Sequence, residues 1–130
     1  MLYVMDASAI LALMQAEKGW EVVDDLIREQ QCVASCVNIA EVGTRMIDKG
    51  LAPSQLERTL KELDIQPVDF DLEQSTFSAE LRLSTKYAGL SLGDRACLAL
   101  TKLLDGIAVT SDRAWLDIAE FTHIKMKIIR

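Results

Sequence analysis

The stretch SLGDRACLALTKLLDGIAVTSDRAW, residues 91–115, decides the fold. Its first part, Ser91 to Leu104, has the apolar spacing of a helix, Asp105-Gly106 ends that helix, and Ile107 to Thr110 reads as a short buried strand. One acid, Asp94, lies in the first turn of the helix, and a second, Asp112, closely follows the strand. Core packing requires a carboxylate at neither place, so the stretch predicts a strand and helix fold with acids at the ends of its elements.

The rest of the chain continues this alternation. The expected strands are Leu2 to Met5, Cys32 to Ser35, Ile65 to Phe70 and Ile124 to Ile129. The expected helices follow Asp6, span Trp20 to Ile27, Asn38 to Lys49, Pro53 to Leu63 and Leu72 to Lys86, and include a helical segment from Ser111 to Ala119. Strands separated by helices cannot pair as hairpins. The pattern therefore predicts an α/β fold with a central, mostly parallel sheet flanked by helices, in a single domain over residues 1–130.

Two prolines refine this outline. Pro53 is followed by Ser54-Gln55-Leu56-Glu57, which has the spacing of a capping box and predicts a helix start there. Pro67 has no backbone N–H to donate, so its strand is expected near an edge of the sheet.

Composition limits the class of protein. The formal net charge of −6 argues against the broad basic face of a protein that binds nucleic acid mainly by neutralising phosphates. Three cysteines, an odd number without C-x-x-C spacing, indicate buried residues rather than disulfides or zinc ligands, and hence a reducing, cytoplasmic location. The apolar N-terminus MLYVMDASAILALM has neither a basic lead nor a clean cleavage site. We therefore expect a buried strand and helix there, and no membrane segment.

Four acids are placed where a ligand would bind. In an open parallel sheet, ligands bind beyond the carboxyl ends of the strands. Asp6 and Asp112 follow the first and fourth expected strands, and Glu41 and Asp94 lie early in helices next to strands. The sequence therefore predicts that four carboxylates from distant segments meet at one rim of the sheet.

Each acid taken alone also has a structural explanation. Asp94 lies three residues after Ser91, which is a capping-box spacing, and a first-turn acid also gains from the helix dipole. Glu41 follows Asn38 at the same spacing, and Asp6 could accept hydrogen bonds from backbone amides at the start of the first helix. The joint placement of the acids, rather than any one of them, points to a site.

A divalent metal ion would explain the joint placement. Like charges gathered at one rim repel one another unless a cation compensates them. A donor set made of oxygens, without histidine or cysteine, suits a hard cation. The sequence therefore predicts Mg²⁺ or Mn²⁺ as the cofactor.

Four motifs carry a resemblance to a known family. They are MDASAI around Asp6, NIAEV around Glu41, LSLGDRACLALT around Asp94 and TSDRAW around Asp112. With these motifs in this order over nearly the whole chain, the sequence resembles PIN-domain proteins, and in size the VapC-type toxins of prokaryotic toxin-antitoxin pairs. The resemblance implies a PIN-like three-layer fold and a metal-dependent ribonuclease in which these four acids are both catalytic residues and metal ligands.

The resemblance implies further roles and partners. The activity would be that of an endoribonuclease that cleaves structured RNA, such as a tRNA or rRNA loop, with a metal-activated water. Ser8, after the first acid, and Asn38, before the glutamate, would support the site, although each could instead be a helix cap. A toxin of this kind would bind a cognate antitoxin and form a homodimer through the helices from Asn38 to Leu63.

Two arginines are candidate substrate contacts. Arg95 and Arg113 each directly follow a site acid and could bind phosphates, although each could equally be a solvent-exposed or helix-pairing arginine. Asp117 lies one helical turn beyond Arg113 and is interpreted as its i,i+4 partner rather than as a fifth site acid.

Three other interpretations stay open. A PIN-like module could bind a partner without cleaving RNA, although the complete set of acids argues against this. A receiver-like phospho-acceptor domain would have an acidic pair after its first strand and a lysine after its last, whereas Asp6 is single and the strand after Asp112 begins IKMK. A haloacid-type phosphatase would have D-x-D where this chain has Asp6-Ala7-Ser8.

Overall fold

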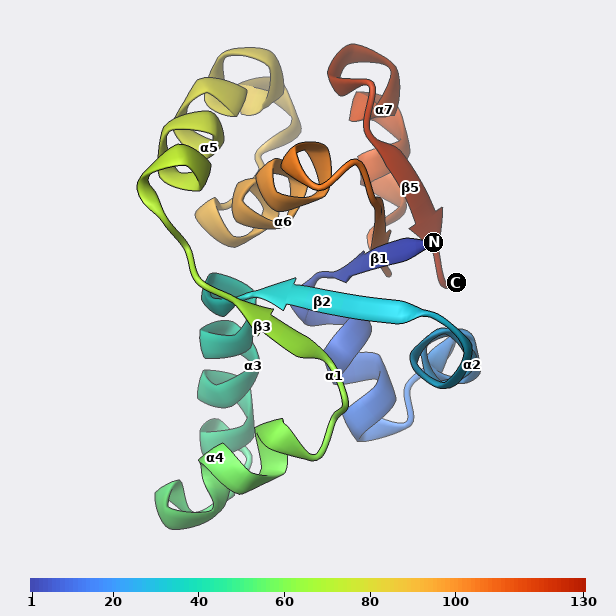
Figure 1. The fold of residues 1–130 in the computed structure, drawn as a ribbon, viewed down its shortest axis with the longest axis vertical. Coiled ribbons are helices and arrows are strands. Elements are labelled where there is room, and N and C mark those ends of the chain that lie inside the picture. Colours follow the sequence, from blue (N-terminus) through green and yellow to red (C-terminus); the bar gives the residue numbers. More distant parts are fainter.

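The computed structural model describes residues 1–130 and contains one five-stranded sheet with the strand order β3-β2-β1-β4-β5 (Figure 1). Every pair of neighbouring strands is parallel, which confirms the predicted sheet. A receiver-like doubly wound sheet has the order 2-1-3-4-5 instead, so the receiver interpretation is wrong. The strands are β1 (Leu2–Met5), β2 (Gln31–Ser35), β3 (Gln66–Val68), β4 (Ile107–Thr110) and β5 (Lys125–Ile128).

Helices cover both faces of the sheet and complete the three layers. In Figure 1, α1 to α4 lie on one side of the strands and α5 to α7 on the other. The helices of the first group are α1 (Ala7–Gln15), α2 (Trp20–Glu29), α3 (Cys36–Asp48) and α4 (Pro53–Lys61). The second group comprises α5 (Leu72–Thr85), α6 (Leu92–Leu103), α7 (Leu116–Thr122) and the 3₁₀ turns η1 (Lys86–Ala88) and η2 (Arg113–Trp115). No helix is long and apolar enough to cross a membrane.

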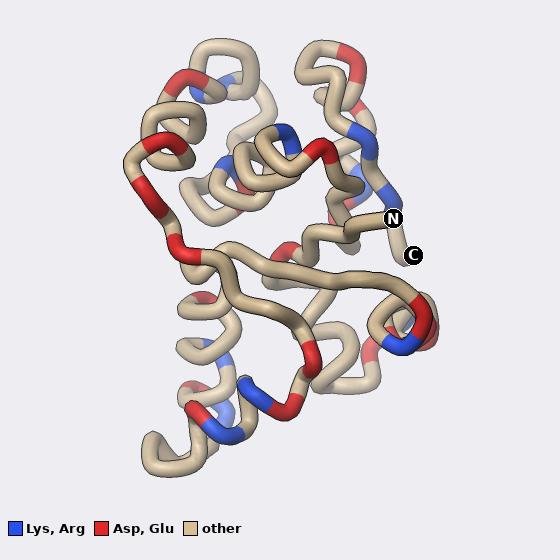
Figure 2. The backbone as a smooth tube through the Cα atoms, viewed as in Figure 1, with Lys and Arg blue, Asp and Glu red and all other residues tan.

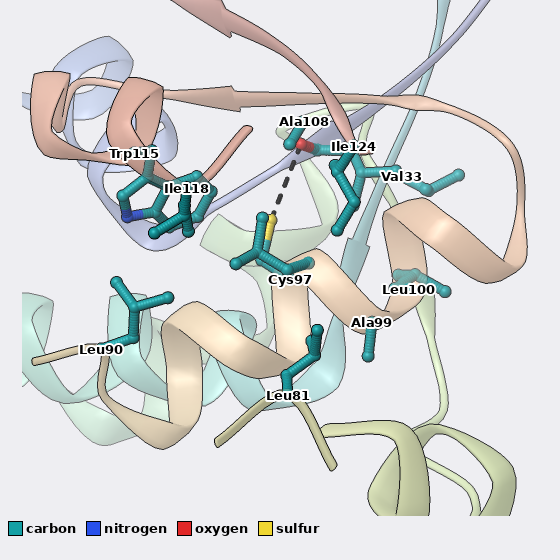
Figure 3. Close-up of a cluster of buried hydrophobic side chains, with 12 residues drawn as sticks. Val33, Leu81, Leu90, Cys97, Ala99, Leu100, Ala108, Trp115, Ile118 and Ile124 are labelled. Carbon is teal, nitrogen blue, oxygen red and sulfur yellow. Dashed lines mark hydrogen bonds between the residues drawn. The ribbon is translucent and has the colours of Figure 1, made fainter. Parts of the chain in front are cut away.

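Two apolar cores, one on each face, hold the helices to the sheet. On one face Ile10, Val23 and Val42 are buried together with residues of β1, β2 and β4. On the other face Trp115 and Cys97 are buried in the cluster that Figure 3 draws. The Cys97 thiol lies 3.9 Å from the backbone oxygen of Val4, so α6 packs directly on the central strand (Figure 3).

The cysteines behave as the sequence predicts. All three are free, Cys32 and Cys97 are buried, and Cys36 is half-buried. Burial raises the pKa of the Cys32 thiol to about 11 and raises that of Cys97 well above its usual value. Both buried thiols therefore stay protonated and act as small apolar residues.

One helix cap and one helix start differ from the prediction. Helix α4 begins at Pro53, and its N-cap is Ala52 without a side-chain cap, so the capping box predicted at Ser54 is wrong. Proline at the first helical position fixes the helix start one residue too early for Ser54 to cap it. Helix α3 begins at Cys36, before the expected Asn38, because the Ser35 hydroxyl accepts a hydrogen bond from the Val37 amide and caps the helix. Pro67 lies on the edge strand β3, as predicted.

Gly19 provides a test of how the C-terminal segment packs. Its φ is +96°, and a Cβ there would lie 2.5 Å from the backbone oxygen of Ile129. Gly50 has a similar φ of +103° but open space around it. We expect Gly50→Ala to lower the unfolding free energy by about 1 to 2 kcal/mol through backbone strain alone. Gly19→Ala should cost more, by roughly another 1 to 3 kcal/mol, because of the added overlap.

The measurement is urea unfolding of both variants beside the wild type, followed by circular dichroism. Gly50→Ala is the matched control, since it shares the strained φ and lacks the close contact. Equal losses in the two variants would contradict the packing of the Ile129 backbone against this turn.

Candidate active site

An open pocket of about 330 Å³ is lined by all four acids that the sequence singled out. Two of them follow strands β1 and β4, one comes from the second turn of α3, and one comes from the first turn of α6. Four carboxylates from distant segments therefore line one pocket at the rim of the sheet, as predicted. The lining residues are Asp6, Ala7, Ser8, Leu11, Asn38, Glu41, Arg45, Asp94 and Asp112.

Asp6 is the most buried of these acids, with only 4% of its surface exposed. It caps α1 by accepting a hydrogen bond of 2.8 Å from the Ala9 amide. The hydroxyls of Ser8 and Thr110 also donate to its carboxylate, at 2.7 Å and 2.5 Å. Burial nevertheless raises the pKa of Asp6 to about 6, with a further upward contribution from the charge of Asp94, while the hydrogen bonds lower it.

Thr110 is a site residue that the sequence analysis missed. It ends β4, is fully buried, and donates to Asp6 while its hydroxyl oxygen accepts from the Asp112 amide at 3.1 Å. Ser8 extends this network, because its hydroxyl oxygen accepts from the Ser111 amide at 2.9 Å. The two loops that follow β1 and β4 are thus tied together. The available signal was a threonine two positions before the last acid, at the end of a buried strand.

Asp94 and Asp112 have a structural role and also face the pocket. Asp94 forms the predicted capping box with Ser91, accepting from its amide at 3.0 Å and donating its own amide to the Ser91 hydroxyl at 3.2 Å. Asp112 caps η2 by accepting from the Ala114 amide at 3.0 Å. In each case one carboxylate oxygen takes the capping bond and the other takes none, so capping and a role in the pocket are compatible.

Glu41 is held against the start of α6 by Asn38. The Asn38 amide nitrogen donates to the Glu41 carboxylate at 2.9 Å and to the Gly93 backbone oxygen at 3.0 Å. Asn38 therefore orients the glutamate and is not a helix cap. A Cβ on Gly93 would overlap the Glu41 carboxylate, so only glycine leaves room for this arrangement.

The two arginines predicted as substrate contacts donate to backbone oxygens. The Arg95 guanidinium donates to the Ser78 backbone oxygen at 2.9 Å, and that of Arg113 donates to the Arg130 backbone oxygen at 3.1 Å. Neither lines the pocket, and their contacts with phosphate stay predictions. Arg113 forms no ion pair with Asp117, so the predicted helical pairing is wrong. The arginine that does line the pocket, Arg45, was missed.

The donors in the pocket suit a hard cation. The four acidic side chains of the pocket offer carboxylate oxygens, which are the donors that Mg²⁺ and Mn²⁺ prefer. Asn38 also lines the pocket, and its side-chain oxygen is buried without a hydrogen-bond partner. No three His, Cys, Asp or Glu side chains have the arrangement of a formed metal site. The carboxylates would therefore have to close around an ion.

The fold and this pocket define an α/β protein with an acidic site at the carboxyl edge of a parallel sheet. The family model described as PIN domain matches residues 3–121. The chain belongs to the PIN domain family. Members of this family are typically nucleases, and PIN nucleases generally use divalent metal ions. No curated protein matches the sequence.

Solved structures share the fold at low sequence identity. A DNA-bound VapBC structure from Salmonella typhimurium matches with a TM-score of 0.74 and 16% identity over 100% of both chains. VapBC-1 from nontypeable Haemophilus influenzae matches with a TM-score of 0.72 and 16% identity over 98% of both chains. FitAB bound to an IR36 DNA fragment matches with a TM-score of 0.70 and 18% identity, over 97% of this chain and 94% of the other.

The raised pKa of Asp6 predicts how pH affects the stability of the metal-free protein. Its folded pKa of about 6 exceeds the unfolded value of 3.8, so the folded state binds more protons between these values. The stability contributed by protonated Asp6 is full below about pH 4 and is lost as pH rises through about 6. The shift of the Asp6 pKa therefore lowers the free energy of unfolding by roughly 3 kcal/mol between the low and the high end of this pH range.

The measurement is urea unfolding in EDTA from about pH 4 to pH 7.5, comparing wild type with Asp6→Asn. The difference in unfolding free energy between them should change across this range, and Asp117→Asn, outside the pocket, should show no such change. A difference that is constant with pH would contradict the burial of an ionisable Asp6.

Proposed function

We propose that this protein is a Mg²⁺- or Mn²⁺-dependent endoribonuclease and the toxin of a VapBC-type toxin-antitoxin pair. The observation that carries the proposal is the convergence of four carboxylates from four segments on one pocket of a PIN domain. A fold that gathers like charges without pairing them to basic side chains is built to bind a cation. The catalytic and metal-binding residues are Asp6, Glu41, Asp94 and Asp112.

The side chains of the pocket have separate tasks in this proposal. A bound divalent ion supplies positive charge for the phosphodiester and lowers the pKa of a water molecule. Asp6 is oriented before any ligand arrives, because Ser8 and Thr110 donate to it and it cannot rotate freely. Asn38 fixes Glu41 with its side-chain nitrogen, which also donates to the Gly93 backbone oxygen.

A single-stranded RNA loop suits the surface of this protein better than a long nucleic-acid duplex. Figure 2 shows acidic and basic residues close together along the outer helices, α2 and α4 among them, rather than one continuous basic face. With a net charge of −6, non-specific attraction to phosphates is weak. A target chosen by shape, such as a single-stranded tRNA or rRNA loop, fits a small acidic pocket with few arginines at its rim. Arg95 and Arg113 remain candidate phosphate contacts near it.

An antitoxin is the proposed protein partner. The similar structures are those of VapBC and FitAB proteins, and another is a toxin-antitoxin complex from Klebsiella pneumoniae. By analogy, a cationic antitoxin segment would enter the acidic pocket and exclude both metal and RNA. We also propose a cytoplasmic homodimer that pairs through the region from Asn38 to Leu63, with residues 1–130 as one nuclease domain.

The second candidate function is a PIN-like module that binds a partner without cleaving RNA. No observation favours it. Capping explains Asp6 alone, but it does not explain why Glu41, which caps no helix, lines the same pocket as the other three acids.

Metal-dependent cleavage is the first test. We expect the purified protein to cleave structured RNAs in Mg²⁺ or Mn²⁺ and to stop in EDTA. Asp94→Asn should lower cleavage by at least about 100-fold because it removes a metal ligand charge. It should leave the fold nearly intact, since the asparagine oxygen can still accept from the Ser91 amide.

The matched control is Asp117→Asn, the same change on α7 outside the pocket, which should cleave like wild type. Cleavage that persists in EDTA would refute the metal dependence. Full activity of Asp94→Asn would show that this acid serves only as a cap.

Gly93→Ala tests the position of Glu41. The new methyl group would meet the glutamate carboxylate, which is the mobile end of a side chain and can move away at little cost to folding. We expect unchanged or slightly higher stability, by up to about 1 kcal/mol from helix propensity. Cleavage should fall about tenfold or more, because displacing a positioned group by a fraction of an ångström is costly to catalysis.

Gly43→Ala is the control, since a Cβ at this helical glycine meets only Leu56, at an ordinary 3.4 Å. Cleavage rates and melting temperatures of both variants give the comparison. Wild-type activity in Gly93→Ala would mean that the Glu41 position seen here is not needed.

A further inference from the structure

We propose that Arg45 binds a phosphate of the RNA strand and positions it over the acidic pocket. The inference rests on the proposed nuclease function and adds to it a substrate-binding residue that no sequence motif marks. Arg45 is the only basic residue that lines the pocket. It lies in α3, one helical turn after Glu41 and two turns after Asn38. Residues at these spacings share one face of a helix, so all three reach the same opening.

The Arg45 guanidinium has no partner within the protein. The ion pairs of the structure lie on the outer faces of α2 and α4, where Arg28, Arg58 and Lys61 pair with nearby acids. No hydrogen bond engages the Arg45 side chain, although four carboxylates line the same pocket. Its side chain is exposed, in contrast to the Arg95 guanidinium, which is directed to a backbone oxygen of α5.

Arg45 does not line the pocket in order to neutralise the charge of Glu41. The Glu41 carboxylate accepts from the Asn38 amide and forms no ion pair with Arg45. A cation beside a metal pocket also repels the metal, so its presence there is unfavourable until an anion binds. A phosphodiester resolves this conflict, because its two free oxygens can contact the cation site on one side and the guanidinium on the other.

The overall charge makes this contact important. The chain carries a net charge of −6 and has no broad basic face to hold RNA by long-range attraction (Figure 2). A short-range arginine contact then supplies a larger share of the affinity than it would in a basic protein. It also fixes where along the strand a phosphate lies, which sets the bond that meets the acids.

The experiment compares Arg45→Ala and Arg45→Lys with wild type in an RNA hairpin cleavage assay in Mn²⁺. Arg45→Ala should raise KM about five- to tenfold with a smaller change in kcat, and Arg45→Lys should lie between, since lysine keeps the charge but loses the two-pronged geometry. The matched control is Arg28→Ala, which removes an exposed arginine of α2 outside both the pocket and the proposed dimer region and should leave KM unchanged.

A binding measurement separates substrate contact from metal binding. In the Asp94→Asn background, adding Arg45→Ala should weaken hairpin binding by about five- to tenfold and reduce the slope of log affinity against log salt by about one phosphate contact. Calorimetric Mn²⁺ affinity of Arg45→Ala alone should be equal to or higher than that of wild type, because a repelling charge is removed.

The outcomes distinguish this inference from the function on which it rests. Absence of RNA cleavage and RNA binding in the wild type would overturn both. An active wild type with unchanged KM, affinity and salt slope in Arg45→Ala would overturn the phosphate contact alone. A weaker Mn²⁺ affinity in Arg45→Ala would also overturn it, because the arginine would then be supporting the carboxylates and not the substrate.

Discussion

The hydrogen bond from Thr110 to the buried carboxylate of Asp6 is the constraint on which the rest of the site depends. It joins the ends of the two adjacent strands β1 and β4, and the Thr110 oxygen in turn accepts the Asp112 amide. Asp6 also caps α1. One carboxylate therefore connects the start of α1, the ends of the two strands and, through Thr110, the amide of Asp112. The position of the acidic pocket relative to the sheet follows from this one group.

Helix capping also explains why the fold accepts several acids at one rim of the sheet. Asp6, Asp94 and Asp112 each cap a helix or 3₁₀ turn, so each gains backbone hydrogen bonds and a favourable interaction with the positive end of the helix. Those local gains offset part of the mutual repulsion in the absence of an ion. The structural explanation of each acid and the functional explanation of the set are therefore complementary, because capping brings the carboxylates to the N-terminal ends of helices that point at the pocket.

The sequence predicts what depends on periodicity and local spacing. The strands, the parallel sheet, the capping box at Ser91 and the four acids at one rim follow from patterns within a few residues. The tasks of Gly93 and Arg45 could not be predicted, because each depends on a group brought close only by the tertiary fold, whereas Thr110 had a local signal in its place two residues before Asp112. The capping box expected at Ser54 failed for a local reason, since proline at the first helical position moved the cap to Ala52.

The pocket also shows how stability and function are balanced in this chain. Asp6 is buried with its pKa raised to about 6, so near neutral pH the metal-free fold holds an ionised group in surroundings that disfavour its charge. An apolar residue there would relieve that cost, yet it would also remove the acceptor that orients Ser8 and Thr110. In the metal-bound state that we propose, a cation would reverse the balance, because it would stabilise the ionised form of Asp6. The buried carboxylate would then couple the stability of the fold to metal binding.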